Sequence, residues 1–192
     1  MAISAIDATS SALSQISEEF TFMNLKLKIQ YLPENEKKQI LWDLGISRML
    51  YATYLNQPQL VESAIEDSHA RYSKDETYHG LPLFWISIYL NRPALLQVFI
   101  SYHANFNVYY KGNTALHLVI EVCNLDAFQK LVWTARVNLN SKNGDGETPL
   151  NLAKRLLKEE IKFIYKDPSK IKTFERMIND LKGLKAKSGF LF

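Results

Sequence analysis

Two stretches of the chain share one pattern of polar and apolar positions. Residues 111–122 read KGNTALHLVIEV and residues 145–156 read DGETPLNLAKRL, so each places a threonine shortly after a glycine and follows it with an apolar run. From Thr114 to Thr148 the period is 34 residues. A period of this length is typical of stacked helical repeats, so the pattern predicts a repeat architecture.

Earlier segments follow the same layout less closely. Residues 80–89 read GLPLFWISIY one period before Thr114, and NQPQLVESAI at 56–65 mirrors NRPALLQVFI at 91–100. Each unit is predicted to contain a helix, a tight turn, a second helix and a protruding loop, for example with helices over 116–121 and 125–133. The sequence therefore predicts an all-α chain.

Local start signals support these helices. Pro82 and Pro149 suit a first helical turn, where the missing N–H has no partner in any case. The Thr148 hydroxyl can cap the helix that Pro149 begins. This helix is predicted to continue to Asp167-Pro168, and the last helix carries one apolar stripe, made up of Ile171, Phe174, Met177, Ile178 and Leu181.

Stacked repeats need covered ends, because one helix pair cannot bury both of its apolar faces. A helix from Pro33 to the stop at Gly45 would cover the first repeat. Upstream of this helix, the apolar residues have helical spacing near Phe20 and alternate with polar residues near Ile29. We favour a helix for this segment. The predicted organisation is an N-terminal helical cap over 1–45, about four repeats over 46–166 with the first and last irregular, and a C-terminal capping helix with a basic tail over 167–192.

The tetrads carry a family resemblance. Residues 148–151 (Thr-Pro-Leu-Asn) and 114–117 (Thr-Ala-Leu-His) each differ by one residue from the Thr-Pro-Leu-His tetrad of ankyrin repeats, and HANFN at 103–107 is similar to their repeat end. The chain thus resembles a divergent ankyrin-repeat protein, which implies a short helical solenoid. It departs from the family at Leu81, which replaces the threonine, and at Cys123, which replaces a glycine.

Composition narrows the class of protein. Hydrophobic residues make up 47% and charged residues 22% of the chain, as in ordinary globular proteins. No signal peptide or membrane-spanning segment is predicted, and the single cysteine excludes an intrachain disulfide. We expect a cytoplasmic protein, or one secreted into a host cell without a classical signal peptide. The second expectation arises because the Lys/Asn/Ile-rich composition and the divergent repeats resemble those of ankyrin effectors of intracellular bacterial pathogens.

Positive charge is concentrated towards the C-terminus. Residues 154–187 hold 11 Lys/Arg against 5 Asp/Glu, within a chain whose formal charge is +3. Such a basic segment can attract nucleic acid or an anionic membrane, although a solvated lysine face explains the same count. Both interpretations stay open.

No catalytic or metal-binding pattern emerges. Cys123 and His117 lie six residues apart across a helix end with no third group to orient the imidazole. The resemblance implies a structural role for His117, and no histidine belongs to a metal-binding motif. We therefore predict a non-enzyme without cofactor, metal or small-molecule substrate.

The resemblance implies a protein partner that docks on the loop tips and the inner-helix surface. The tips correspond to 72–79, 109–111 and 141–145. An open apolar groove is one interpretation; the other is that a register slip or the N-terminal segment buries its residues. The alternative function is a regulatory or inhibitory subunit in the protein's own cell. The predicted partner-binding residues are Trp85, Ile88, Tyr89, Tyr109, Tyr110, Lys111, Leu118, Glu121, Val122, Lys142 and Arg155.

Overall fold

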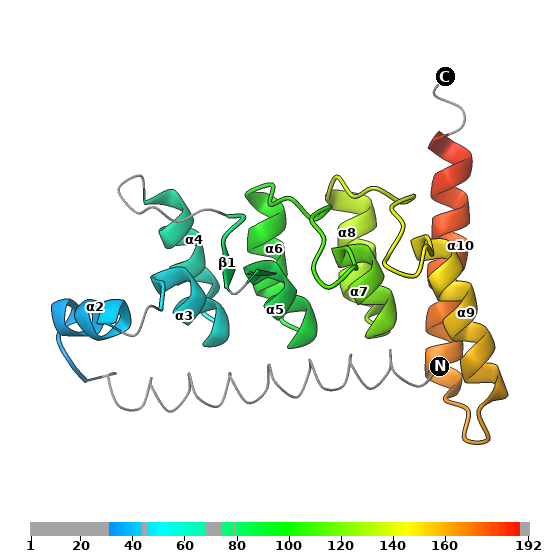
Figure 1. Ribbon diagram of the computed structural model, residues 1–192, viewed down its shortest axis with the longest axis horizontal. Coiled ribbons are helices and arrows are strands. Elements are labelled where there is room, and N and C mark those ends of the chain that lie inside the picture. The colour runs from blue at the N-terminus through cyan, green and yellow to red at the C-terminus, as the bar shows by residue number, and fades with distance from the viewer. Residues whose placement is uncertain (1–30, 44–45, 68–73, 79, 189–192) are drawn as a thin grey trace. The chain divides into compact units, whose positions relative to one another are not determined.

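The computed structural model describes residues 31–43, 46–67, 74–78 and 80–188, and most of this part is helical (Figure 1). The all-α prediction is confirmed to this extent. The described chain divides into two compact units, one ending at Ala104 and the other beginning at Asn105. Most of the predicted N-terminal cap, parts of the predicted tip at 72–79 and the last four residues of the predicted tail lie outside the described residues.

The first unit contains short helices and one small hairpin. Helix α2, which fits the helix predicted from Pro33, precedes the pair of α3 and α4, and the hairpin of β1 and β2 leads to the pair of α5 and α6 (Figure 1). The strands pair antiparallel, with Thr77 opposite Pro82 and Tyr78 opposite Leu81, a feature that the sequence analysis did not predict. The elements are α2 (Glu34–Asp43), α3 (Arg48–Tyr54), α4 (Pro58–Glu66), β1 (Thr77–Tyr78), β2 (Leu81–Pro82), α5 (Leu83–Tyr89) and α6 (Pro93–Ser101).

The tight turns inside both helix pairs have the same local cause. Asn56 and Asn91 adopt left-handed φ angles of 54° and 47°, a region that asparagine tolerates better than most residues. Two residues later, Pro58 and Pro93 begin α4 and α6. An Asn-x-Pro sequence therefore reverses the chain and starts the second helix. Pro82, in contrast, is the N-cap of α5 and not a residue of its first turn, which corrects the prediction.

Buried aromatic and aliphatic side chains form the core of the first unit. The ring centroids of Phe84 on α5 and Phe99 on α6 lie 6.4 Å apart in an edge-to-face arrangement. The first unit also contains a charged side chain that contacts the end of a helix. The half-buried Arg92 donates hydrogen bonds from Nη1 to the carbonyls of Thr53 and Tyr54 at 2.9 and 2.7 Å. A cation at this place satisfies the terminal carbonyls of α3 and complements its dipole.

The second unit has two helix pairs. The predicted helices over 116–121 and 125–133 are confirmed to within one residue, and Thr148 caps α9 as predicted, accepting from the Asn151 amide at 3.4 Å. The predicted stripe on the last helix is buried, except that Ile171 is half-buried. Within the described residues, no helix is long and apolar enough to span a membrane. The helices are α7 (Ala115–Glu121), α8 (Leu125–Thr134), α9 (Pro149–Lys162) and α10 (Pro168–Ser188).

Helix α9 is shorter than predicted. It ends at Lys162, and Phe163 is extended with φ −64° and ψ 140°. Proline disfavours helical geometry in the residue before it, so the chain must leave the helix before Asp167, and the β-branched and aromatic residues at 163–165 have weak helix propensity. The chain turns here and α10 packs against α9 (Figure 1).

The Arg92 contact yields a stability prediction. Arg92→Met keeps most of the aliphatic stem but removes the donor to α3, so we expect the free energy of unfolding to fall by about 1–3 kcal/mol. Urea denaturation followed by circular dichroism measures it. Arg136→Met changes an exposed arginine and should alter stability by less than about 0.5 kcal/mol. Equal effects of the two substitutions would contradict the capping role.

Candidate functional site

Two loops of the second unit, residues 109–113 and 141–147, are joined to each other; we call them the hairpin ledge. In the first loop, Tyr110 and Asn113 exchange backbone hydrogen bonds of 2.9 and 3.0 Å, which close a narrow turn. In the second, the Gly144 amide donates to the Gly112 carbonyl at 2.8 Å. The loops are thus fixed to each other by their backbones.

The contact between the loops requires a glycine. Gly112 has φ +80°, and a Cβ at this position would lie 3.3 Å from both the nitrogen and the Cα of Gly144. A side chain here would therefore strain the backbone and press on the other loop at once. The close approach of the two loops depends on Gly112.

The second loop is organised around Asn143, which is 8% exposed. Its side-chain oxygen accepts hydrogen bonds from the Asp145 amide at 3.1 Å and from the Glu147 amide at 2.8 Å. The backbone amide of Asn143 donates to the Glu147 carbonyl at 2.9 Å. Because a single side chain satisfies two loop amides, the loop keeps one conformation.

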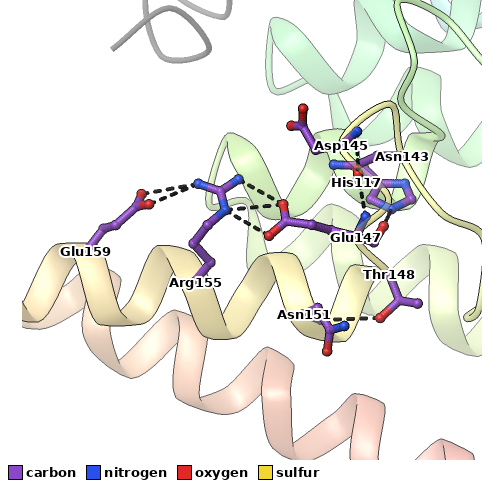
Figure 2. A network of polar contacts seen from close by, with 8 residues as sticks. All are labelled: His117, Asn143, Asp145, Glu147, Thr148, Asn151, Arg155 and Glu159. Carbon is purple, nitrogen blue, oxygen red and sulfur yellow. Dashed lines mark hydrogen bonds and ion pairs between the residues drawn. The ribbon is translucent and has the colours of Figure 1, made fainter. Parts of the chain in front are cut away.

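A buried histidine connects α7 to this loop. The Thr114 amide can only donate, and it lies 3.3 Å from Nδ1 of His117; the Thr114 hydroxyl is 2.8 Å from the same nitrogen. Nε2 lies 3.0 Å from the Glu147 carbonyl, which can only accept (Figure 2). The proton therefore resides on Nε2. Burial lowers the pKa of His117, outweighing the Glu147 carbonyl and charge, so the imidazole stays neutral.

An arginine of α9 lies between two carboxylates. The guanidinium of Arg155 contacts both oxygens of Glu147, with Nε at 2.9 Å from Oε1 and Nη2 at 3.0 Å from Oε2, and its Nη1 reaches Glu159 at 3.1 Å (Figure 2). These bonds, first of all the one to Glu147, raise the pKa of Arg155 although burial opposes this. Arg155 thus ties the ledge to the face of α9.

A half-buried carboxyl at the end of α7 is hydrogen-bonded to the first loop. The Asn113 side-chain amide donates to both oxygens of Glu121 at 3.1 and 3.2 Å. Burial raises the pKa of Glu121 to about 7, and the charges of Asp145 and Glu147 add to this, while Asn113 and Arg155 lower it. Glu121 is therefore a carboxyl that changes charge near neutral pH.

Several predicted partner-binding residues gather on the ledge or on the helices that adjoin it. Tyr109 is 55% and Val122 38% exposed, and the side chains of Lys111 and Lys142 are exposed as well. Tyr110 is half-buried with the Lys111 ammonium 5.6 Å from its ring centroid, within the range of a cation–π contact. Glu121 and Arg155 are half-buried in the network described above. This part of the predicted surface is accessible.

The predicted apolar stripe on the inner helices is wrong at three positions. Trp85, Ile88 and Leu118 are buried, with exposed fractions of 2%, 1% and 1%. The reason is that every residue of 83–88 and of 115–120 is buried, so neither helix exposes a side chain before its last residue. Tyr89, in that last turn of α5, is half-buried with its ring 6.1 Å from that of Trp85.

Three residues that hold the ledge together were not predicted from the sequence: Asn113, Asn143 and Glu147. The sequence Asn-Gly-Asp-Gly at 143–146 was a usable signal, since asparagine and glycine favour such turns. The pairing of Glu147 with Arg155 had no local signal, because eight residues separate the two.

Cys123 and His117, for which the sequence favours structural roles, have separate surroundings. Both nitrogens of His117 are engaged by Thr114 and Glu147, and burial raises the pKa of the Cys123 thiol. Over the residues that the structure describes, no group of three or more histidine, cysteine or acidic side chains is placed to hold a metal ion.

Comparison with known proteins finds no matching family model and no significantly similar curated sequence.

Glycine substitutions test the close approach within the ledge. Gly112 and Gly146 both have left-handed φ angles. A Cβ added at Gly112 would press on Gly144, whereas a Cβ added at Gly146 would meet open space. Gly146→Ala should lower the free energy of unfolding by about 1 kcal/mol through backbone strain alone, whereas Gly112→Ala should cost distinctly more. Urea unfolding of both variants measures the difference, and amide exchange at Gly144 should quicken only in Gly112→Ala. Equal losses would contradict the tight contact.

The raised pKa of Glu121 yields a pH prediction. The unfolded chain releases this proton near pH 4.5, while the folded chain retains it up to about pH 7. The contribution of the protonated carboxyl to stability is thus complete below pH 4.5 and is lost as the pH rises through about 7. Glu121→Gln keeps an acceptor for Asn113 without the charge. Its stability relative to the wild type should rise over this window by on the order of 2 kcal/mol; a pH-independent difference in urea unfolding would contradict this.

Proposed function

We propose that the chain is a protein–protein interaction module of the ankyrin-repeat kind and that the hairpin ledge binds its protein partner. The observation that carries the proposal is the Gly144–Gly112 hydrogen bond of 2.8 Å, which fixes two loops whose tips expose Tyr109, Lys111 and Lys142. Exposed side chains on loops held by a rigid scaffold are typical of recognition surfaces.

The order of the ledge favours binding. Association costs less when the loops are already held in one conformation, and here backbone pairing, Asn143 and the Arg155–Glu147 ion pair hold them. Tyr109 supplies a large amphipathic side chain of the type that dominates binding energy at interfaces. The exposed Lys111 and Lys142 lie in the same two loops as the exposed Asp145, so the ledge presents charges of both signs that a complementary partner surface can match.

Recurring local geometry supports the ankyrin-like character. Helices α3, α5, α7 and α9 begin at residues 48, 83, 115 and 149, so successive starts are 35, 32 and 34 residues apart. Left-handed residues recur with the helices: Asn56, Asn91 and Cys123 follow α3, α5 and α7, while Gly80, Gly112 and Gly146 precede α5, α7 and α9. Different side chains thus form the same recurring backbone conformation.

A capture experiment tests the proposal. The tagged full chain and a ledge variant, Tyr109→Ser with Lys111→Asn and Lys142→Ser, are incubated with cell lysate, and retained proteins are identified by mass spectrometry. Asparagine suits the left-handed φ of 49° at position 111. A direct partner, purified and titrated against both chains, should bind the variant at least about tenfold more weakly, since it loses an aromatic anchor and two charges.

A matched control changes one exposed aromatic residue and two exposed lysines away from the ledge. Trp133→Ser with Lys154→Ser and Lys182→Ser removes the same number of charges. This control should bind the partner like the wild type, and circular dichroism should give the same spectrum for all three chains. Equal binding by the ledge variant would overturn the role of the ledge.

A further inference from the structure

The turn between α9 and α10 exposes apolar side chains in succession; we call residues 161–166 the α9–α10 tip. The exposed fractions are 44% for Ile161, 65% for Phe163, 91% for Ile164 and 90% for Tyr165. Single exposed apolar residues need no explanation, but a contiguous group of this size signals contact with another apolar phase. The group lies at the end of a helix pair (Figure 1).

Hydrogen bonds at its base hold the tip in place. The Asp167 amide donates to the Glu160 carboxylate at 3.0 Å, and the Phe163 amide donates to the Glu160 carbonyl at 3.2 Å. On the other side, the Asp167 carboxylate accepts from the Ser169 amide at 2.8 Å and begins α10. The apolar side chains therefore project from a closed turn that is anchored on both sides.

Lysines surround the tip. Five lysines and three acidic residues lie between residues 158 and 172. The acids are engaged, because Glu159 pairs with Arg155 at 3.1 Å and the other two accept the hydrogen bonds at the base. The lysines are all exposed and outnumber the acids, so a surface that approaches the tip meets a net positive charge; they are Lys158, Lys162, Lys166, Lys170 and Lys172.

We propose that the α9–α10 tip inserts into the interface of an anionic lipid bilayer, with the lysines contacting lipid headgroups. An apolar and aromatic group next to lysines has the composition of an interfacial anchor, and lysines near such a surface are attracted by acidic lipids. This site goes beyond the proposed protein-binding ledge and does not depend on it.

The exposure pattern favours a bilayer over a protein groove. A helix in a groove presents positions about three or four apart, and an added strand presents alternate positions. Phe163, Ile164 and Tyr165 are consecutive and all are exposed together, so the tip presents apolar side chains at adjacent positions and fits neither spacing. A bilayer accepts a projecting tip from all sides, whereas a groove would leave some of it in water.

Vesicle sedimentation tests the proposal. The full chain is titrated with vesicles of phosphatidylcholine alone or with about 30% phosphatidylserine. We expect binding to the anionic vesicles. Phe163→Ser with Ile164→Ser and Tyr165→Ser should weaken it at least about tenfold, and Lys158→Gln with Lys162→Gln and Lys166→Gln should weaken it too. Trp133→Ser removes an exposed aromatic residue elsewhere on the second unit and should bind as the wild type does.

A dye reports insertion directly. Cys123 is the only cysteine, so Ile164→Cys combined with Cys123→Ala allows one environment-sensitive label at the tip. Its emission should shift to the blue with anionic vesicles. No vesicle binding, binding that needs the lysines but not the apolar residues, or an unshifted emission would overturn the proposal. The proposal would also be overturned if the wild type did not bind vesicles but bound a protein partner that the triple serine variant no longer binds. Failure of the ledge experiment would not affect the membrane proposal.

Discussion

A neutral histidine fixes the geometry on which the second unit depends. His117 accepts from Thr114 at the start of α7 and donates from Nε2 to the Glu147 carbonyl, so one imidazole joins the first turn of a helix to a loop 30 residues away. Asn143 accepts from the Glu147 amide, and Arg155 binds its side chain. Glu147 is thus held at its carbonyl, its amide and its carboxylate. The loop that contains it can therefore approach Gly112 to hydrogen-bond distance.

The same arrangement concentrates negative charge. The half-buried carboxyl of Glu121 lies within the electrostatic influence of Asp145 and Glu147, which raise its pKa, and of Arg155, which lowers it. Its raised pKa is the energetic consequence, because a charge that is neither fully solvated nor fully paired favours protonation.

The sequence predicted elements where a local signal decided the structure. Pro149 and Thr148 define the start of α9, and the stripe around Met177 identifies the buried face of α10. Orientation failed at Trp85 and Leu118 because α5 and α7 are apolar on nearly all sides, and a helix without a polar face gives no signal for the direction of its side chains. The contact of Gly112 with Gly144 depends on two loops meeting in space, which no local pattern encodes.

The two proposed surfaces of the second unit are compatible because of one helix. Helix α9 begins at Pro149, immediately after the ledge, and ends at Lys162, within the α9–α10 tip. Its 14 residues span about 21 Å at 1.5 Å per residue. An interfacial anchor enters a bilayer by only about 5–10 Å, so a tip inserted with α9 upright would leave the ledge clear of the membrane. A protein bound there and a bilayer bound at the tip would then be held at a distance set by α9, a regular helix bonded to the ledge through Arg155.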